Sequence, residues 1–365
     1  MQTETIVFSD IDYSYKEGLL LIKSKSKYGF IDTLGKITIP FVYEKASSFS
    51  EEVAAVCLNG KYGYINKYNE VIIPFMYESA NDFSEGLAPV MLHGTWRYID
   101  KKNKQHIQLA NSINEAHPFS NGLATVYNSH NKGGYINQSG DLVIPDIYEY
   151  ADSFKDGIAL VESGPYVGYI NSQGTYVIPS IHYNGLNCCK GMVSVLKEDD
   201  KWSVFDKDGK EVSHFESFEY VDIFQDGFAL VKQNRKYGIT DIDGKIIIPC
   251  IYDYSIVYKG DLFCVCHNSR WGAVDKNHNI VIPFKYMNLQ PLSENRYLAR
   301  LEAMQTIIID ETDKAVCRLS PKETKAYKRF QSLNLVDKTI KIWGVFLGIV
   351  AITYVFFKII SAIWD

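Results

Sequence analysis

Hydrophobic and polar positions repeat along most of the chain. A clear copy of the pattern begins with Lys-Tyr-Gly-Tyr-Ile-Asn at residues 61–66, continues after a four-residue turn with the apolar run at 70–77, and ends at 83–90. The glycine of the first segment returns about every 34 residues, and a fixed period of this length indicates a repeat architecture. The glycines that define the repeat are Gly29, Gly63, Gly134, Gly168, Gly238 and Gly272.

Each copy predicts a three-stranded antiparallel meander. Asp or Asn opens the turn before the third strand, and Gly closes it in several copies, as in Asp32-Thr33-Leu34-Gly35; this composition is typical of a four-residue hairpin loop. The third strand carries an Ile-Pro pair, and because proline has no N–H for a ladder, the strand is expected to stop there. The prolines in phase are Pro40, Pro74, Pro145, Pro179, Pro249 and Pro283.

Both faces of each meander are apolar. In a strand over 61–66, Gly63 and Ile65 would share one face, with Tyr62 and Tyr64 on the other. Each small sheet should therefore be covered on both sides by neighbouring units. A glycine in mid-strand leaves room for close approach, and we expect a ring or backbone of the next unit to occupy it.

The overall fold predicted is an all-β array of about nine units over residues 1–320, the last one degenerate. Propellers have about four to eight blades, so nine units favour an open superhelical array. A closed, propeller-like ring in which residues 6–13 complete the final unit is the alternative.

The repeated Lys-aromatic-Gly signature resembles the WG-repeat family of bacterial tandem modules. It occurs as Lys27-Tyr28-Gly29, Lys236-Tyr237-Gly238 and Arg270-Trp271-Gly272, with Tyr replacing the family's Trp in several copies. The resemblance covers roughly residues 8–319. It implies a β-rich repeat that usually serves in binding, and it brings no catalytic residues with it.

The composition changes after the repeats. Residues 321–341 are predicted to form a basic helical linker, and the apolar residues 342–364 a transmembrane helix of about 34 Å, with Lys358 snorkelling to the nearer interface. Basic residues before the span are retained on the cytoplasmic side, and the chain begins without a secretory signal. We therefore expect a single-pass membrane protein, anchored at its C-terminus, with the array in the cytoplasm and the lipid bilayer as one partner.

Charge and candidate chemistry narrow the function further. The net charge is −5 although the linker is basic, so the repeats are acidic and poorly suited to nucleic acid. The 7 cysteines are odd in number and lack paired Cys-x-x-Cys motifs, which fits free thiols in a reducing compartment. No histidines stand at metal-ligand spacing with a third ligand nearby, and no nucleophile elbow or phosphate-binding loop is present. No cofactor, metal or catalytic residue is expected.

The function predicted is that of a non-enzymatic scaffold for a protein or peptide. The alternative is an enzyme or small-ligand receptor with a composite site in unit three or six, where the pattern degenerates. Unit six has Cys188-Cys189 within its Phe-x-x-Gly segment, but sequence drift is the simpler explanation. The residues whose clustering around one cavity would favour the alternative are Arg97, His106, His117 and Trp202.

Overall fold

The computed structural model describes residues 7–8, 15–24, 26–186, 188–197, 199–215, 217–223, 227–293, 295–302 and 305–321. Most of the predicted linker, from residue 322, and the whole predicted membrane helix at 342–364 lie outside these residues. Within the described part of the chain, no helix has the length and apolarity needed to cross a membrane.

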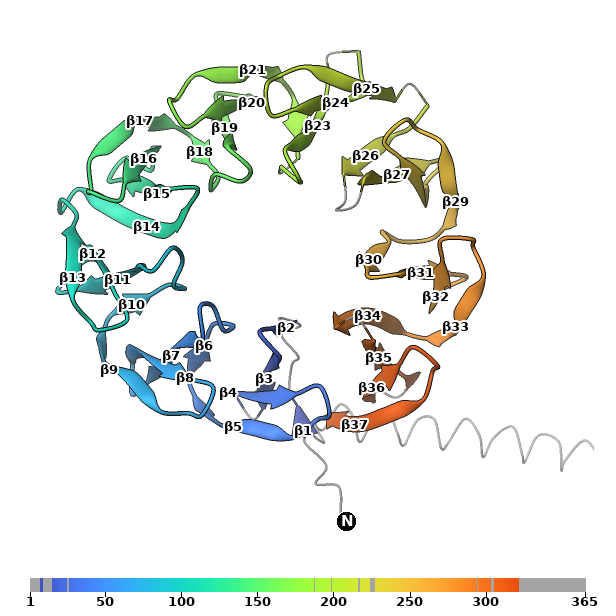
Figure 1. Ribbon diagram of the computed structural model, residues 1–365, viewed down its shortest axis with the longest axis horizontal. Helices are drawn as coiled ribbons and strands as arrows, with labels where there is room; N and C mark the ends of the chain where they lie inside the picture. Colours follow the sequence, from blue (N-terminus) through green and yellow to red (C-terminus); the bar gives the residue numbers. More distant parts are fainter. Residues whose placement is uncertain are drawn as a thin grey trace, which may run out of the picture.

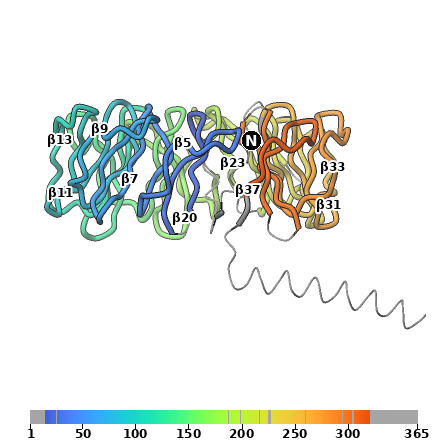
Figure 2. The backbone as a smooth tube through the Cα atoms, turned by 90° about the horizontal axis from the view of Figure 1, so that it is seen from below, coloured from blue at the N-terminus to red at the C-terminus, as the bar shows by residue number. Residues whose placement is uncertain are grey.

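The described residues form nine small sheets arranged around a ring, which is shallow when seen edge-on (Figures 1 and 2). Each sheet is built from four consecutive antiparallel strands, and we number these blades 1 to 9 in chain order, from β2–β5 to β34–β37. The first strand of each blade faces the centre of the ring, and the fourth forms the outer edge (Figure 1).

The first strands are β2 (Tyr15–Lys16), β6 (Lys45–Ala46), β10 (Ser79–Ala80), β14 (Ile113–Ser120), β18 (Tyr150–Ala151), β22 (Asn184–Gly185), β26 (Tyr220–Ile223), β30 (Val257–Lys259) and β34 (Asn288–Ser293). The second strands are β3 (Leu19–Ser24), β7 (Val53–Leu58), β11 (Ala88–Leu92), β15 (Leu123–Asn128), β19 (Ile158–Ser163), β23 (Met192–Leu196), β27 (Phe228–Gln233), β31 (Leu262–His267) and β35 (Arg296–Arg300).

The third strands are β4 (Lys27–Asp32), β8 (Lys61–Asn66), β12 (Thr95–Ile99), β16 (Gly133–Asn137), β20 (Tyr166–Asn171), β24 (Trp202–Asp206), β28 (Lys236–Asp241), β32 (Arg270–Asp275) and β36 (Thr306–Asp310). The fourth strands are β5 (Ile37–Tyr43), β9 (Val71–Tyr77), β13 (Gln105–Gln108), β17 (Leu142–Tyr148), β21 (Tyr176–His182), β25 (Glu211–Phe215), β29 (Ile246–Tyr252), β33 (Ile280–Tyr286) and β37 (Ala315–Pro321).

The ring is closed, so the favoured prediction of an open array is wrong and the alternative is correct. A further strand, β1 (Val7–Phe8), pairs in parallel with β37, so residues from the start of the chain complete the last blade. Blades 1 and 9 also share a hydrophobic cluster that contains Leu20 and Ile22 of β3 and Leu298 of β35. Because the ring is closed, the first and last blades cover each other's apolar faces, and no capping unit is needed.

The prediction of three strands per unit is also incomplete, because each blade has a fourth, innermost strand. In five of the described blades this strand is two residues long, for example β10, which pairs Ser79 with Met91 and Ala80 with Val90. Two residues are too few to show the alternation by which strands are recognised in a sequence.

Apolar side chains from both faces of the blades pack between neighbours, as predicted. The cluster between blades 1 and 2 joins Phe30 and Ile39 of the first blade to Phe49, Val56 and Ile65 of the second. Similar clusters follow around the ring. The turn chemistry is confirmed as well, since the Asp32 carboxylate accepts hydrogen bonds from the N–H groups of Leu34 (2.9 Å) and Lys36 (2.8 Å).

The repeated glycine has a different role from the one predicted. A Cβ atom on Gly63 would lie 2.6 Å from the carbonyl oxygen of Ile73, which is in the same blade and not in the next unit. The reason is a bulge in β9: Tyr62 pairs with Tyr77 and Tyr64 with Ile73, so the segment around Pro74 folds over the glycine. Proline therefore lies within the outer edge strand and does not end it, because an edge position leaves its missing N–H without consequence.

Blades without the glycine confirm this relation between glycine and bulge. Where Arg97, Ser203 and Ile307 replace it, these residues pair directly with Gln108, His214 and Arg318 on the fourth strand. In these three blades the fourth strand runs alongside the third at this position, so a side chain fits there.

Candidate functional site

Blades 1 to 5 are joined by a phenylalanine that lies at the end of the first strand of one blade or shortly after it. This phenylalanine packs on an aromatic ring in the third strand of the blade before it. The ring centroids are 4.8–4.9 Å apart in four successive joints. The pairs are Phe30–Phe49, Tyr64–Phe83, Tyr98–Phe119 and Tyr135–Phe154.

The serine that follows this phenylalanine in blades 2 and 4 fastens the next joint along the chain. Ser50 donates a hydrogen bond to the carbonyl oxygen of Phe83 at 2.8 Å, and Ser120 does the same to Phe154 at 2.5 Å. The phenylalanine ring is thus held by aromatic contact, and its backbone by the hydroxyl of the previous blade.

Blades 5 and 6 break both parts of this rule. Lys155 stands where blades 2 and 4 carry Ser50 and Ser120, and Cys188 stands where blade 5 carries Phe154. Cys188 faces Ile158 and Tyr169 of blade 5 within one hydrophobic cluster. A cysteine side chain is much smaller than a phenylalanine ring, so the joint lacks most of the side-chain volume that fills the four preceding joints.

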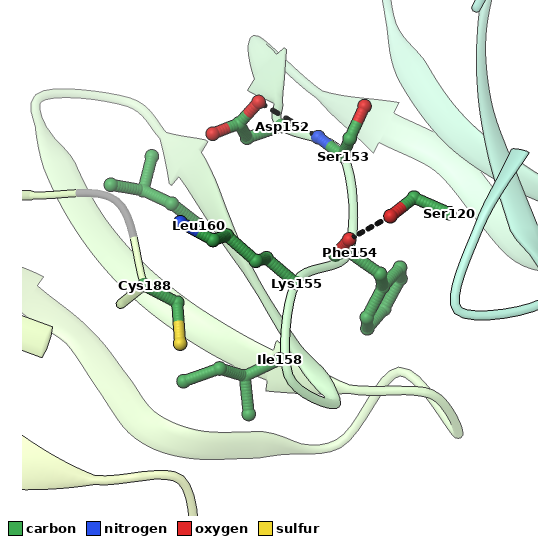
Figure 3. Close-up of a pocket in the computed structure, with 8 residues that line it drawn as sticks. All are labelled: Ser120, Asp152, Ser153, Phe154, Lys155, Ile158, Leu160 and Cys188. Carbon is green, nitrogen blue, oxygen red and sulfur yellow. Dashed lines mark hydrogen bonds between the residues drawn. The ribbon is translucent and has the colours of Figure 1, made fainter. Parts of the chain in front are cut away.

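A partly open cavity of 260 Å³ lies at this joint (Figure 3). Cys188, Ile158, Leu160 and Phe154 supply its buried apolar wall, each less than 9% exposed. The remaining lining residues are polar: Ser120, Asp152, Ser153 and Lys155. Figure 3 shows the Lys155 side chain running across the cavity.

The apolar wall of the cavity is uncharged, whereas its polar, more exposed side, here called the mouth, carries charged groups. Burial, with the nearby charge of Asp156, raises the pKa of the Cys188 thiol to about 11, so the thiol is neutral at physiological pH. Its sulfur lies 3.8 Å from an oxygen of Asp156, which also accepts the N–H of Gly191 at 3.1 Å. A protonated, buried thiol is a poor nucleophile, and it forms an apolar wall.

The mouth carries both signs of charge. Asp152 accepts a hydrogen bond from the N–H of Ser153 at 2.8 Å, and its remaining carboxylate surface is half-exposed. Lys155 is exposed, and within the part of the chain that the structure describes no carboxylate lies within ion-pair distance of its ammonium group. The cavity therefore combines an apolar floor with an ammonium group available to a ligand.

The four residues predicted as a possible site do not line this cavity. In blade 3, Arg97 donates hydrogen bonds to the carbonyl oxygen of Leu92 and to Gln105, both at 2.9 Å. His106 of the same blade lies 3.0 Å from Asp100.

The other two candidates lie in different blades. His117, in β14 of blade 4, contacts Glu115 at 3.2 Å. Trp202, in β24 of blade 6, is 2% exposed, and its indole donates to the carbonyl oxygen of Glu219 at 3.1 Å. Figure 1 places β24 well apart from β12 and β13, so the four side chains do not meet around one cavity.

Sequence reasoning missed Lys155, Ile158 and Leu160. The signal is Cys188, which departs from the Phe-x-x-Gly segment and for which sequence drift is the simpler explanation from the sequence alone. Among the described residues, no group of three or more His, Cys, Asp or Glu side chains is placed to hold a metal ion.

Nine four-stranded blades around one axis define a β-propeller. The chain belongs to the family described as WG containing repeat, whose model matches residues 28–62, 62–96, 134–164, 202–237, 237–271 and 271–302, more than half of the sequence. The family expected from the Lys-aromatic-Gly signature is therefore confirmed. No curated protein matches the sequence.

The solved structures that are similar to this one have low sequence identity to it. A eukaryotic initiation factor is 15% identical with a TM-score of 0.52, over 74% of this chain and 85% of the other. The dihydro-haem d1 dehydrogenase NirN is 11% identical with a TM-score of 0.47, over 86% and 75%. BamB from Moraxella catarrhalis is 11% identical with a TM-score of 0.39, over 82% and 96%. At 15% identity the likeness to the initiation factor concerns the fold alone.

Proposed function

We propose that this protein is a non-enzymatic binding scaffold, whose propeller presents a docking site to a protein or peptide at the surface of a membrane. The observation that carries the proposal is the cavity between blades 5 and 6, where two substitutions open a joint that a phenylalanine fills in the four preceding ones. A propeller supplies a rigid frame for such a site, because each blade packs on the next around a closed ring.

The membrane part of the proposal rests on the sequence. Residues 342–364 are apolar except for Lys358, and this length is enough to span the hydrocarbon core. Basic residues at 322–341 precede this segment. Because such residues are retained on the cytoplasmic side of a membrane, they favour an orientation with the propeller in the cytoplasm. In this arrangement the ring faces cytoplasmic partners while the end of the chain holds it at the bilayer.

Two experiments test the proposal. Proximity labelling from the full-length protein in its own cell should enrich a specific set of proteins over a propeller carrying scrambled residues 342–364. Fractionation should find the full-length chain with membranes, and protease added to intact cells should leave the propeller uncut. A full-length chain in the soluble fraction, or a propeller digested from outside, would overturn the membrane part.

A further inference from the structure

We propose that the cavity between blades 5 and 6 binds an aromatic side chain of a partner peptide, and that Lys155 pairs with a carboxylate next to that side chain. This inference rests on the proposed function and names the chemistry of the partner. Its two parts are an apolar floor and the ammonium group of Lys155, and they come from two separate substitutions in the repeat. The charge of Lys155 acts on the carboxyl of Asp222, but no carboxylate of the described residues lies within ion-pair distance of it.

The floor matches the surroundings of a phenylalanine ring elsewhere in the molecule. In blade 1, Leu19 and Leu21 of β3 and Phe30 of β4 share a cluster with Phe49 of the next blade. The corresponding residues of blade 5 are Ile158, Leu160 and Tyr169, and they cluster with Cys188. Ile158 and Leu160 line the cavity, whereas Tyr169 belongs to the cluster without lining the cavity. The two aliphatic surfaces that receive an internal ring in blade 1 are therefore retained in blade 5, but the chain itself supplies no ring.

The size of the cavity agrees with this occupant. An apolar cavity of about 150 Å³ holds a benzene ring in a protein interior. The 260 Å³ available here accommodates a ring together with the start of its backbone, and the cavity is partly open, so the ring can enter from outside. A long aliphatic chain would fit the depth, but it would not reproduce the edge-on or tilted ring contacts, with interplanar angles of 51–64°, that Phe49, Phe83, Phe119 and Phe154 make in the other joints.

Lys155 adds specificity at the mouth. In blades 2 and 4 the equivalent serine is satisfied by a carbonyl oxygen of the next blade, whereas Lys155 has no ion-pair partner among the described residues. An ammonium group at the mouth of an apolar pocket favours a ligand carboxylate, and it also favours the face of an aromatic ring. A peptide with an aromatic residue beside an acidic one provides both.

The site can be tested on the full-length protein in lipid nanodiscs, with empty nanodiscs as the blank. The probe is N-acetyl-L-phenylalanine, which has a ring and a carboxylate, and binding is followed by saturation-transfer NMR. A ligand of this size should bind with a Kd on the order of 1 mM. N-acetyl-L-phenylalaninamide, which lacks the carboxylate, should bind about five-fold more weakly.

Three variants separate the parts of the site. Cys188→Phe fills the cavity and should abolish binding of both probes. Lys155→Ser restores the serine of other blades and should reduce the acid's affinity to that of the amide. Cys189→Ser, the matched control, installs the serine found beside the phenylalanine in blades 2 to 4 and should leave binding unchanged. The melting temperature of each variant reports that it is folded.

The outcomes distinguish this inference from the proposed function. No saturable binding by the wild type, equal binding by Cys188→Phe, or equal affinity for acid and amide would overturn the aromatic–carboxylate assignment. Proximity labelling is then repeated with Cys188→Phe. If Cys188→Phe still enriches the partners of the wild type, the assignment of an aromatic ligand to this cavity is wrong, and the proposed scaffold function is upheld. If the wild type itself enriches no proteins, the proposed scaffold function is wrong.

Discussion

Two joints of the ring, between blades 2 and 3 and between blades 5 and 6, differ in the residues that fill them. In the first, Phe83 packs on Tyr64 at 4.9 Å and is fixed by Ser50. In the second, Cys188 and Lys155 occupy the equivalent places, and a cavity remains. The blade after each joint is a four-stranded sheet, with or without the phenylalanine. The phenylalanine therefore fills space between blades and is not needed for the blade to form.

The difference shows that a repeat protein can acquire a cavity when one repeat loses a large side chain that other repeats use to fill the joint. Each joint buries its own set of apolar contacts, and a ring of many joints tolerates one that is weaker. The loss of packing at blades 5 and 6 is local, and the surfaces that would have received the ring stay in place.

The largest effect is expected when the filled joint is opened. Phe83→Cys should destabilise the propeller by about 2–4 kcal/mol, because removing a buried ring leaves a cavity and loses the transfer free energy of its carbons. Chemical denaturation of the full-length chain measures this change. A loss of less than about 0.5 kcal/mol would mean that the joint collapses around the smaller side chain.

A smaller loss is expected when a consensus glycine gains a side chain. Gly63→Val should cost about 1–3 kcal/mol, since its Cβ would meet the carbonyl oxygen of Ile73 at 2.6 Å and the fourth strand would have to move. The matched control is Arg97→Val in blade 3, where the fourth strand pairs regularly and a side chain is already present. Equal losses in both variants would contradict the link between glycine and bulge.

The smallest effect concerns an exposed carboxylate that ties blade 2 to blade 3. Hydrogen bonds from the backbone of Gly94 and His93, with Lys61 3.7 Å away, hold the pKa of Glu78 below its usual value of 4.5. A carboxyl whose pKa is lowered by folding stabilises the protein above its unfolded pKa, and this stabilisation is lost as the pH falls through the folded pKa.

Wild-type stability should therefore fall as the pH is lowered from about 5 to about 3, and Glu78→Gln should remove a small part of that dependence. Melting temperatures of the two proteins across this range provide the measurement. Identical pH profiles would show that Glu78 does not contribute. Glu44, Glu149 and Asp253 have lowered pKa values for similar reasons at other joints, so most of the pH dependence should remain.

Much of the fold could be predicted because the repeat occurs many times and each of its marks reflects the chemistry of a particular side chain. The Asp32 turn, the apolar faces and the period follow from side chains that act within a few residues of one another. Ring closure could not be predicted in this way. It depends on β1, two residues that pair with a strand more than 300 positions later, and neither their pattern nor their length distinguishes them from a tail.

The site was harder to predict for a related reason. Cys188 could be recognised as a departure, but whether a departure leaves a cavity depends on what its neighbours do. At Arg97 the fourth strand straightens and the side chain finds partners, whereas at Cys188 the surrounding surfaces stay apart. The prediction for Gly63 is wrong because the bulge that covers this glycine arises from its own blade, and a pattern of alternating positions does not show a bulge.

The most direct test of the central claim is the stability of Cys188→Phe relative to wild type, measured by chemical denaturation at neutral pH. If the joint between blades 5 and 6 is an emptied phenylalanine site, restoring the ring should stabilise the propeller by about 0.5–2 kcal/mol, as cavity-filling substitutions commonly do. This is the opposite sign to Phe83→Cys. A loss of 1 kcal/mol or more, of the size expected for about one methylene too many in a packed core, would show that the joint is already filled and would contradict the account.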